Sequence, residues 1–396
     1  MKHAALRVGV AGLGRAFTFM LPTFLRDPRL RLVAATDPLP APRARFTADF
    51  GGPAYETIEP LCADPNVDVV YIATPHGFHA DHACLALAHG KHVLVEKPMA
   101  CRLPECDTMI AAAQAAGRHL IVGHSHSFDR PIARAREIID GGDFGAVRMI
   151  NALYCTDFMY RARRPEELRT EDGGGVIFNQ AAHQIDIVRL LGGGLVRSVR
   201  ATTGVWDPAR PTEGAYSALL TFGNGSFATA AYSGYGHYDG DELMENFDEM
   251  GRPKHPGDYG GARRRLAEFG AGVDEASVKA TRNYGGSAYV PSTDTVSTAH
   301  QHFGFVLVCC ERGDLRPTPT GIFTYGDRER RFEPIPSTGI PRIEVVDELS
   351  RAVVDDVAPL HSGAWAKATL EACLAMLDSA RTGRDIELRH QCLPQA

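Results

Sequence analysis

The sequence predicts an α/β domain with a parallel sheet, followed by an α+β domain with a large, mostly antiparallel open sheet. Strand and helix signals alternate over the first 125 residues, whereas longer strand signals separated by turns dominate after Val147. The chain has 396 residues, too many for one ordinary domain. We therefore expect one domain over residues 1–125 and a second over residues 126–396.

The first domain contains five apolar runs of strand length, with helical segments between them. Each crossover is short enough for a right-handed βαβ unit, which predicts parallel pairing. The expected strands are Arg7–Ala11, Leu30–Thr36, Val67–Ala73, His92–Val95 and His119–Val122, and the clearest helices are His82–Ala88 and Pro104–Ala116.

The second domain has a different pattern. Long strand signals occur at Val147–Leu153, Val196–Thr203, Ser217–Thr221 and Ser226–Ser233. Residues 239–295 are charged and glycine-rich with weak periodicity, so we expect an insertion or excursion with a helix around Ala262–Phe269. A last helix over Ala366–Ser379 presents one apolar face.

Composition limits the function. A formal net charge of −6 gives no general attraction to nucleic acid or to anionic membranes, and no apolar run reaches the roughly 20 residues of a membrane span. The nine cysteines are scattered and form no CxxC pair, and no signal peptide precedes the first strand. We expect a cytoplasmic protein that binds neither nucleic acid nor membrane.

A glycine turn follows the first predicted strand. Gly12 and Gly14 occupy the first two positions of the dinucleotide fingerprint, and Leu13, Arg15 and Ala16 complete a turn that approaches phosphate at a helix N-terminus. The third glycine is replaced by Phe17, so the motif alone is weak.

Asp37 ends the second strand, about 20 residues beyond the turn, where a carboxylate binds ribose hydroxyls. Because an acid there repels a 2′-phosphate, the sequence favours NAD, with NADP the weaker candidate. The alternative is that Asp37 only punctuates a turn before Pro38.

Two further strand ends carry candidate site residues. Ala73, Thr74 and Pro75 let the backbone pass close to a flat cofactor, and His79 follows them as a cofactor residue or as a satisfied polar contact. The segment Val93–Pro98 ends in Glu96 and Lys97. A lysine beside apolar residues can have a depressed pKa and accept a proton near neutrality.

The second domain contains a glycine run that leads into an expected helix. On that helix Asn179, His183 and Asp186 recur at i, i+4 and i+7 and would share one face. His183 could then exchange a proton near pH 7. The alternative is a buried, hydrogen-bonded histidine.

Taken together, these motifs resemble the Gfo/Idh/MocA oxidoreductases. The resemblance rests on the glycine turn, Thr74-Pro75 with His79, Glu96-Lys97-Pro98, and the Gly173–Asp186 block. It implies an NAD(P)-dependent dehydrogenase with a Rossmann domain and an open-sheet domain, Lys97 and His183 as catalytic pair, and a homo-oligomer, either dimer or tetramer.

Two positions depart from the family pattern. Asn179 stands where the family usually has aspartate, so it can orient a hydroxyl or Lys97 but cannot relay a proton. His124 and His126 follow the fifth strand, where we expect them to bind substrate. No carboxylate or cysteine completes a metal site with these histidines and His183, so we expect none.

Three arginines, Arg161, Arg163 and Arg164, follow the first strand of the second domain and suit a carboxylate-bearing substrate, with Arg130 as a further candidate. A solvated basic surface or an oligomer contact remains open. The segments around His124 and Arg164 resemble the phthalate 4,5-dihydrodiol dehydrogenase branch of the family. That resemblance implies NAD-dependent oxidation of an anionic cyclic cis-diol to a catechol. An inositol or sugar dehydrogenase and an inactive NAD-binding regulator are the alternatives.

Overall fold

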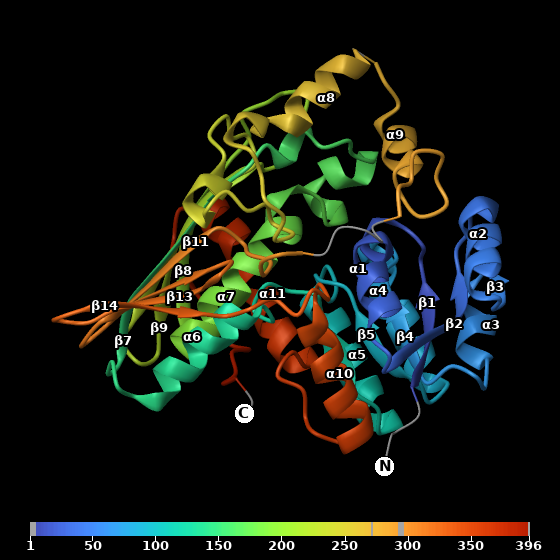
Figure 1. Ribbon diagram of the computed structural model, residues 1–396, viewed down its shortest axis with the longest axis horizontal. Helices are drawn as coiled ribbons and strands as arrows, with labels where there is room; N and C mark the ends of the chain where they lie inside the picture. Colours follow the sequence, from blue (N-terminus) through green and yellow to red (C-terminus); the bar gives the residue numbers. More distant parts are fainter. Residues whose placement is uncertain (1–4, 271, 292–296, 395–396) are drawn as a thin grey trace.

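The computed structural model describes residues 5–270, 272–291 and 297–394 and consists of two sheets with their covering helices (Figure 1). The first sheet is parallel, with six strands in the order β3-β2-β1-β4-β5-β6. Its strands are β1 (Leu6–Ala11), β2 (Leu30–Thr36), β3 (Ala54–Tyr55), β4 (Val69–Ile72), β5 (His92–Val95) and β6 (Leu120–Val122).

Five helices connect these strands: α1 (Arg15–Arg26), α2 (Pro40–Phe50), α3 (Ile58–Ala63), α4 (His79–Ala88) and α5 (Leu103–Ala116). Strand order reverses between β1 and β4, which is where an open α/β sheet opens its ligand crevice. The glycine turn, Ala73–Pro75 and Glu96–Lys97 all follow strands beside this point. The local sequence signals therefore converge at one edge of the sheet.

The second sheet has nine strands in the order β14-β13-β12-β11-β7-β10-β9-β8-β15. Its pairs are antiparallel except β10 with β7. The strands are β7 (Val147–Cys155), β8 (Val196–Gly204), β9 (Ala215–Phe222), β10 (Phe227–Ser233), β11 (Phe305–Cys310), β12 (Asp314–Thr318), β13 (Gly321–Tyr325), β14 (Arg330–Pro334) and β15 (Ile386–Glu387). The expected fold class is confirmed, although β11–β15 were not anticipated individually.

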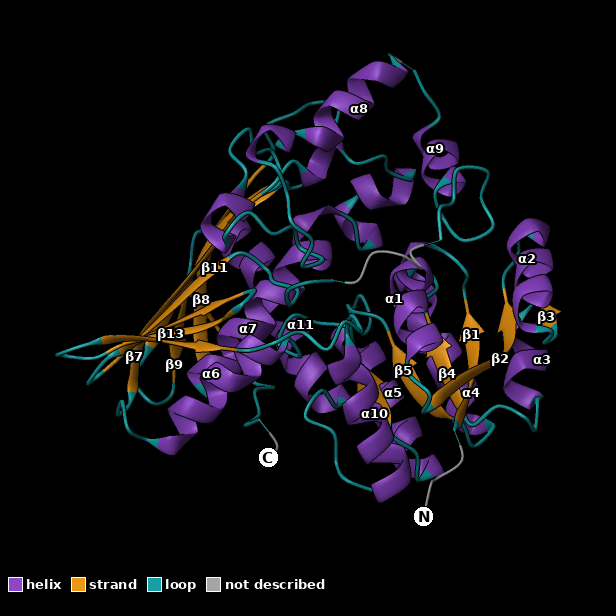
Figure 2. Ribbon diagram, viewed as in Figure 1, coloured by secondary structure: helices purple, strands orange, loops and turns teal. Residues whose placement is uncertain are grey.

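Helices cover one face of this sheet and leave the other uncovered (Figures 1 and 2). The covering helices are α6 (Arg130–Gly141), α7 (Ala182–Gly192) and α11 (Gly363–Thr382). Their apolar side chains and the inward side chains of the strands form one core cluster. Helix α11 also packs against α5 and so joins the two domains.

Helix α10 (Ile343–Asp355) packs into the core of the first sheet, although it follows the second domain in sequence. Val345, Val346 and Leu349 belong to the same cluster as Val8 and Val10 of β1. The division at residue 125 stays a prediction. In three dimensions, the first domain receives part of its core from the far end of the chain.

Residues 239–295 form an excursion with α8 (Gly261–Phe269), near the predicted helix, and α9 (Glu275–Thr281); positions 271 and 292–295 lie outside the described residues. Its Tyr284 packs edge-on against Phe17 with ring centroids 5.2 Å apart, and its hydroxyl donates to Asp49 at 2.7 Å. The residue at the third fingerprint position is thus a core contact between the excursion and α1. Among the described residues, no helix is both long and apolar enough to cross a bilayer.

Candidate active site

A cavity of about 1680 Å³ lies between the strand ends of the first sheet, the start of the α7 region and the excursion. A single small-molecule pocket usually occupies about 300–1,000 Å³. The larger volume is sufficient for a dinucleotide and a substrate side by side. Gly12, Asp37, Lys97 and His183 all line it.

The glycine turn fits a dinucleotide. Gly12 has φ +93°, and a side chain there would lie 2.8 Å from the Ala73 carbonyl oxygen, so only glycine is accommodated. At Gly14, which lines the cavity, an added Cβ would have no atom within 4 Å. The N-terminus of α1 at Gly14 has no side-chain cap, which leaves its N–H groups for a pyrophosphate. Arg15 and Ala16 also line the cavity, whereas Leu13 is buried.

The Asp37 carboxylate closes the same end of the cavity. It accepts hydrogen bonds from the backbone N–H groups of Leu13 and Leu39, each at 2.9 Å, and is mostly buried. These bonds tie the carboxylate to the glycine turn. Each oxygen keeps a further lone pair that a ribose hydroxyl could use.

Residues after β4 form the next part of the wall. Ala73, Thr74 and Pro75 line the cavity, but the ring nitrogens of His79 lie 2.9 Å from the Thr74 and Pro98 carbonyl oxygens. His79 is fully buried, and burial lowers its pKa. His79 also lines the cavity, so its role as a cofactor residue stays a prediction, while its ring lies between the loops that carry Thr74 and Pro98.

Lys97 reaches across the domain boundary. Its Nζ donates to the main-chain oxygen of Asn179 at 2.6 Å. Burial lowers the pKa of Lys97 to about 8, while the charge of Glu96 opposes this shift. Glu96 is itself buried and accepts a hydrogen bond from the Tyr71 hydroxyl at 2.5 Å. Lys97 can thus lose its proton close to neutral pH.

His183 lies on the opposite wall, at the start of α7. Burial and the charge of Lys97 lower its pKa well below the ordinary value, so the ring is neutral. Its Nδ1 is buried and has no hydrogen-bond partner among the residues that the structure describes. A buried polar atom without a partner is costly, so it is available for a ligand.

The expectation that Asn179, His183 and Asp186 share one face is wrong. Ile177–Ala181 form a π-helical turn before α7, which shifts the register of side chains along the helix. The Asn179 amide donates to Gly175 O at 2.7 Å, whereas Asp186 accepts from Trp365 Nε1 at 2.6 Å, away from the cavity. Asn179 therefore contacts Lys97 through its backbone, not its side chain.

His124 lines the cavity, whereas His126 lies beneath its wall. The expectation that no carboxylate completes a set with these histidines is wrong: Asp129 lies 2.7 Å from His126 Nδ1 and 3.3 Å from His124 Nε2. The ligand atoms of these three side chains all lie within 4.8 Å of one another, close enough to hold a metal ion. Burial alone would lower the pKa of His126, but Asp129 and Glu249 facing it raise the pKa. A proton on His126 can thus supply the positive charge that Asp129 needs.

The three arginines have different positions. Arg161 points into the cavity, and its Nη2 lies 3.5 Å from Glu249 Oε2. Arg163 is buried, donates to the Phe158 carbonyl oxygen at 2.6 Å and stacks on the Phe158 ring. Arg164 pairs with Glu166 at 3.0 Å. All three residues line the cavity, but the guanidinium of Arg161 faces Glu249, whereas those of Arg163 and Arg164 bond groups of their own loop.

Arg130 pairs with Glu137 on α6 and is absent from the residues that line the cavity. Sequence reasoning missed two others that do line it, Glu249 and Arg342. Arg342 lowers the pKa of Lys97, His183 and His124, so its charge acts at the catalytic end. Both lie outside any strand-end motif. Their charged side chains are the one sequence feature that could have indicated a role in the site.

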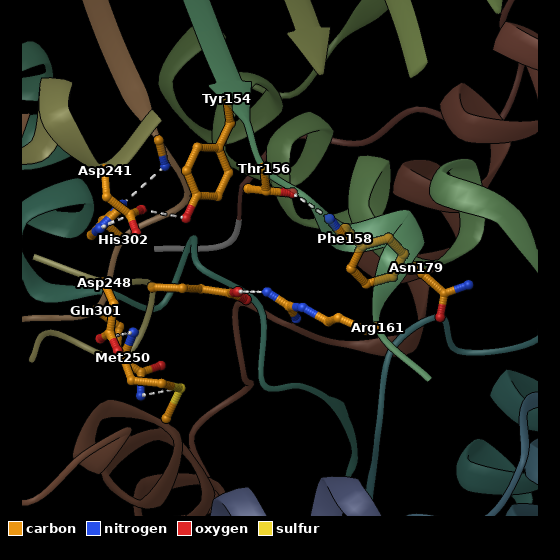
Figure 3. A network of polar contacts seen from close by, with 12 residues as sticks. Tyr154, Thr156, Phe158, Arg161, Asn179, Asp241, Asp248, Met250, Gln301 and His302 are labelled. Carbon is orange, nitrogen blue, oxygen red and sulfur yellow. Dashed lines mark hydrogen bonds and ion pairs between the residues drawn. The ribbon is translucent and has the colours of Figure 1, made fainter. Parts of the chain in front are cut away.

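Figure 3 shows how this end of the cavity is built. Arg161 reaches towards the segment carrying Asp248 and Met250, while Tyr154 donates to Asp241 Oδ1 at 2.8 Å on the sheet side. Asp241 also faces Lys254 and His302. Polar groups of the excursion therefore form the wall opposite the first sheet.

Comparisons with known proteins agree with this architecture. Residues 6–124 match the Gfo/Idh/MocA oxidoreductase family model for an NAD-binding Rossmann fold, and residues 132–245 match a C-terminal domain of the same family. The chain is 48% identical to the 1-carboxy-3-chloro-3,4-dihydroxycyclohexa-1,5-diene dehydrogenase of Comamonas testosteroni, over 95% of each chain.

Solved structures are similar over the whole length. A protein assigned as a dehydrogenase from Bordetella bronchiseptica RB50 superposes with a TM-score of 0.91 at 41% identity, covering 97% of this chain and 100% of the other. The WlbA dehydrogenase from Bordetella pertussis, solved with NADH and UDP-GlcNAcA, has a TM-score of 0.68 at 21% identity, with 97% and 99% coverage. At that identity the likeness is one of fold.

Proposed function

The chain belongs to the Gfo/Idh/MocA oxidoreductase family and is an NAD(P)-dependent dehydrogenase, and we propose that it oxidises a carboxylate-bearing cyclohexadiene cis-diol to a catechol. The relative from Comamonas testosteroni, named for a carboxylated dihydroxycyclohexadiene, supports this substrate class. The observation that carries the proposal is the amine of Lys97, held at the domain boundary by the Asn179 carbonyl oxygen, with the neutral ring of His183 lining the same cavity.

The chemistry requires hydride and proton to leave one carbinol carbon. Bound NAD supplies the hydride acceptor. Lys97, with its pKa lowered to about 8, takes the hydroxyl proton, and the N–H of the neutral His183 ring donates a hydrogen bond to the oxygen that loses it. The resulting ketone tautomerises to the aromatic diol, which makes oxidation the favoured direction.

Binding of the ring carboxylate falls to Arg161, whose guanidinium faces the cavity, and to Arg342 near Lys97. A planar guanidinium matches a carboxylate with two parallel hydrogen bonds. A second ring carboxylate, as in a phthalate diol, is the finer form of this proposal. Arg161 and Arg342 would then each meet one of the two carboxylates.

NAD is the proposed cofactor. Asp37 stands at the end of β2 beside the glycine turn, where its negative charge would repel the 2′-phosphate of NADP. We place the enzyme in the cytoplasm, where NAD is available and where its nine cysteines, all free, would stay reduced.

Turnover on a substrate panel tests the function. The panel contains mono- and dicarboxylated cyclohexadiene cis-diols, their uncarboxylated parent, and inositols, with NADH absorbance as readout. We expect the highest kcat/KM on a carboxylated diol. Faster turnover of inositols would favour the sugar-dehydrogenase alternative, and NAD binding without turnover of any diol would favour an inactive regulator.

A homo-oligomer is also proposed. The uncovered face of the second sheet exposes Leu153, Leu219 and Phe227, each at about 40% of its surface. Leu219 and Phe227 are diagonal neighbours on the paired strands β9 and β10, and exposed apolar side chains grouped on a sheet favour a protein contact. A second copy of this chain is the partner that we propose.

A further inference from the structure

Glu249 is a carboxylate that a remote part of the chain brings into the active site. It lies near the tip of a tight hairpin in which Phe247 pairs with Pro253 and Asp248 N donates to Arg252 O at 2.9 Å. The family match ends at residue 245, so this hairpin follows the matched region. Glu249 is therefore a feature of this excursion.

The hairpin is held rigidly. Gly251 has φ +73°, and a side chain there would lie 2.3 Å from the Ala299 carbonyl oxygen. Ser297 Oγ lies 3.2 Å from both the Met250 and the Gly251 carbonyl oxygens, and His302 Nε2 lies 2.9 Å from the Phe247 carbonyl oxygen. These contacts fix the position from which Glu249 projects.

The carboxylate faces an imidazole and a guanidinium at distances that leave its lone pairs available. Its Oε1 lies 3.7 Å from His126 Nε2, and its Oε2 lies 3.5 Å from Arg161 Nη2. The guanidinium of Arg161 beside the Oε2 atom favours the charged, acceptor form of the carboxylate. Glu249 is therefore an ionised hydrogen-bond acceptor, with a side chain that is 25% exposed to the cavity.

Glu249 also acts on the catalytic amine. After burial, the strongest influences on the pKa of Lys97 are the charges of Glu96 and Glu249, both of which raise it. Glu96 already accepts the Tyr71 hydroxyl, and the Asn179 amide is bonded to its own loop. Glu249 is thus the carboxylate at this end whose acceptor capacity is open to a ligand.

We propose that Glu249 binds the second hydroxyl of the vicinal diol, the one that is not oxidised. This inference rests on the proposed function, because it requires a diol. An ionised acceptor bonds a hydroxyl more strongly than a neutral one does. The mono-hydroxy analogue lacking that hydroxyl would leave Glu249 without this bond, at a cost of roughly 10–100-fold in affinity.

The experiment measures binding to the NADH-loaded enzyme by calorimetry, in the wild type and in Glu249→Gln. The probes are protocatechuate, which carries the two adjacent hydroxyls of the expected product, and its two mono-hydroxybenzoate analogues, meta and para. We expect the wild type to favour protocatechuate over both. In Glu249→Gln the preference for protocatechuate should fall to a few-fold over the analogue that lacks the hydroxyl bound by Glu249. The preference over the other analogue should persist.

Two further variants keep the result interpretable. Glu171→Gln removes an exposed carboxylate that lines the same cavity and should leave all preferences unchanged. If Glu249→Gln does not fold, Glu249→Asp keeps the charge but shortens its reach, and should weaken protocatechuate more than the affected analogue.

The outcomes separate the two proposals. If protocatechuate binds and its preference over both analogues is unchanged, or falls equally for both, Glu249 does not hold a hydroxyl and only this inference fails. If protocatechuate does not bind while inositols are oxidised, the carboxylated-diol function fails and the hydroxyl subsite fails with it.

Discussion

Burial lowers the pKa of Lys97, and the charges of neighbouring carboxylates raise it. Its pKa is lowered to about 8, with Glu96 and Glu249 acting in the other direction. Burial also keeps His183 neutral, and its Nδ1 has no hydrogen-bond partner in the described part of the chain. The two groups suit a hydroxyl that must lose a proton near neutral pH.

Lys97→Ala removes the proton acceptor. We expect turnover to fall by roughly 10²–10⁴, the usual contribution of a positioned acid–base group, with NAD affinity largely kept. Steady-state kinetics and NADH fluorescence titration measure the two effects. Unchanged turnover would show that another group takes the proton.

The pH profile follows from the sign of the shift. Only the neutral amine accepts a proton, so kcat/KM for oxidation should rise with pH up to about 8, the pKa of Lys97, and then level off. Glu96→Gln removes a charge that raises this pKa, so the rise should move to lower pH. If the rise in the pH profile stays at the same pH in Glu96→Gln, a group other than Lys97 is responsible for it.

Asp37→Ala tests cofactor choice. Without the carboxylate, repulsion of the 2′-phosphate disappears, and the ratio of kcat/KM for NAD over NADP should fall by about tenfold or more. Both cofactors are compared on the same diol. A constant ratio would mean that Asp37 serves only its bonds to Leu13 and Leu39.

Short irregular elements decide which side chains reach the cavity. The π-helical turn Ile177–Ala181 directs the Asn179 carbonyl, not its amide, to Lys97. The loop after β7 folds Arg163 onto Phe158 and leaves Arg161 free to face the cavity. Neither outcome follows from helical or strand periodicity.

Arg163→Ala should therefore act on stability. Loss of a buried guanidinium that bonds the Phe158 carbonyl oxygen leaves that acceptor unpaired, at about 1–3 kcal/mol of unfolding free energy. Urea unfolding measures it, with Arg164→Ala, a half-exposed neighbour, expected to change stability by less than about 1 kcal/mol. If Arg163→Ala raises KM for the carboxylated diol without lowering stability, Arg163 binds substrate instead.

At the scale of the whole molecule, helices cover one face of the nine-strand sheet and leave the other open (Figure 2). Helix α11 packs against both β8 and α5 and so links the two domains, while α10 adds to the core of the first. The excursion closes the cavity through Tyr284 against α1.

Leu219→Asp places a charge on the open face, where Leu219 is 41% exposed. We expect the wild type to be a dimer or tetramer by light scattering after gel filtration, and the variant to dissociate. Thr202→Asp, on the neighbouring β8, serves as a control on an already polar site. A monomeric wild type would contradict the proposed interface.

Much of the first domain could be read from local sequence. Apolar runs followed by glycine or charged residues place Gly12, Asp37 and Lys97 at strand ends, because parallel strands present those ends at one sheet edge. The fold class, the family and the residues before position 125 follow from such signals. They depend on neighbours within a few positions of the chain.

Contacts between distant segments decided the rest of the site. Asp129 beside two histidines, Arg342 near Lys97 and Glu249 facing Arg161 come from separate elements, and no periodicity marks them. A charged side chain reaches a cavity only where packing leaves room for it and supplies partners for its charge. Local sequence fixes the strand ends, whereas packing across the two sheets determines which charges meet there.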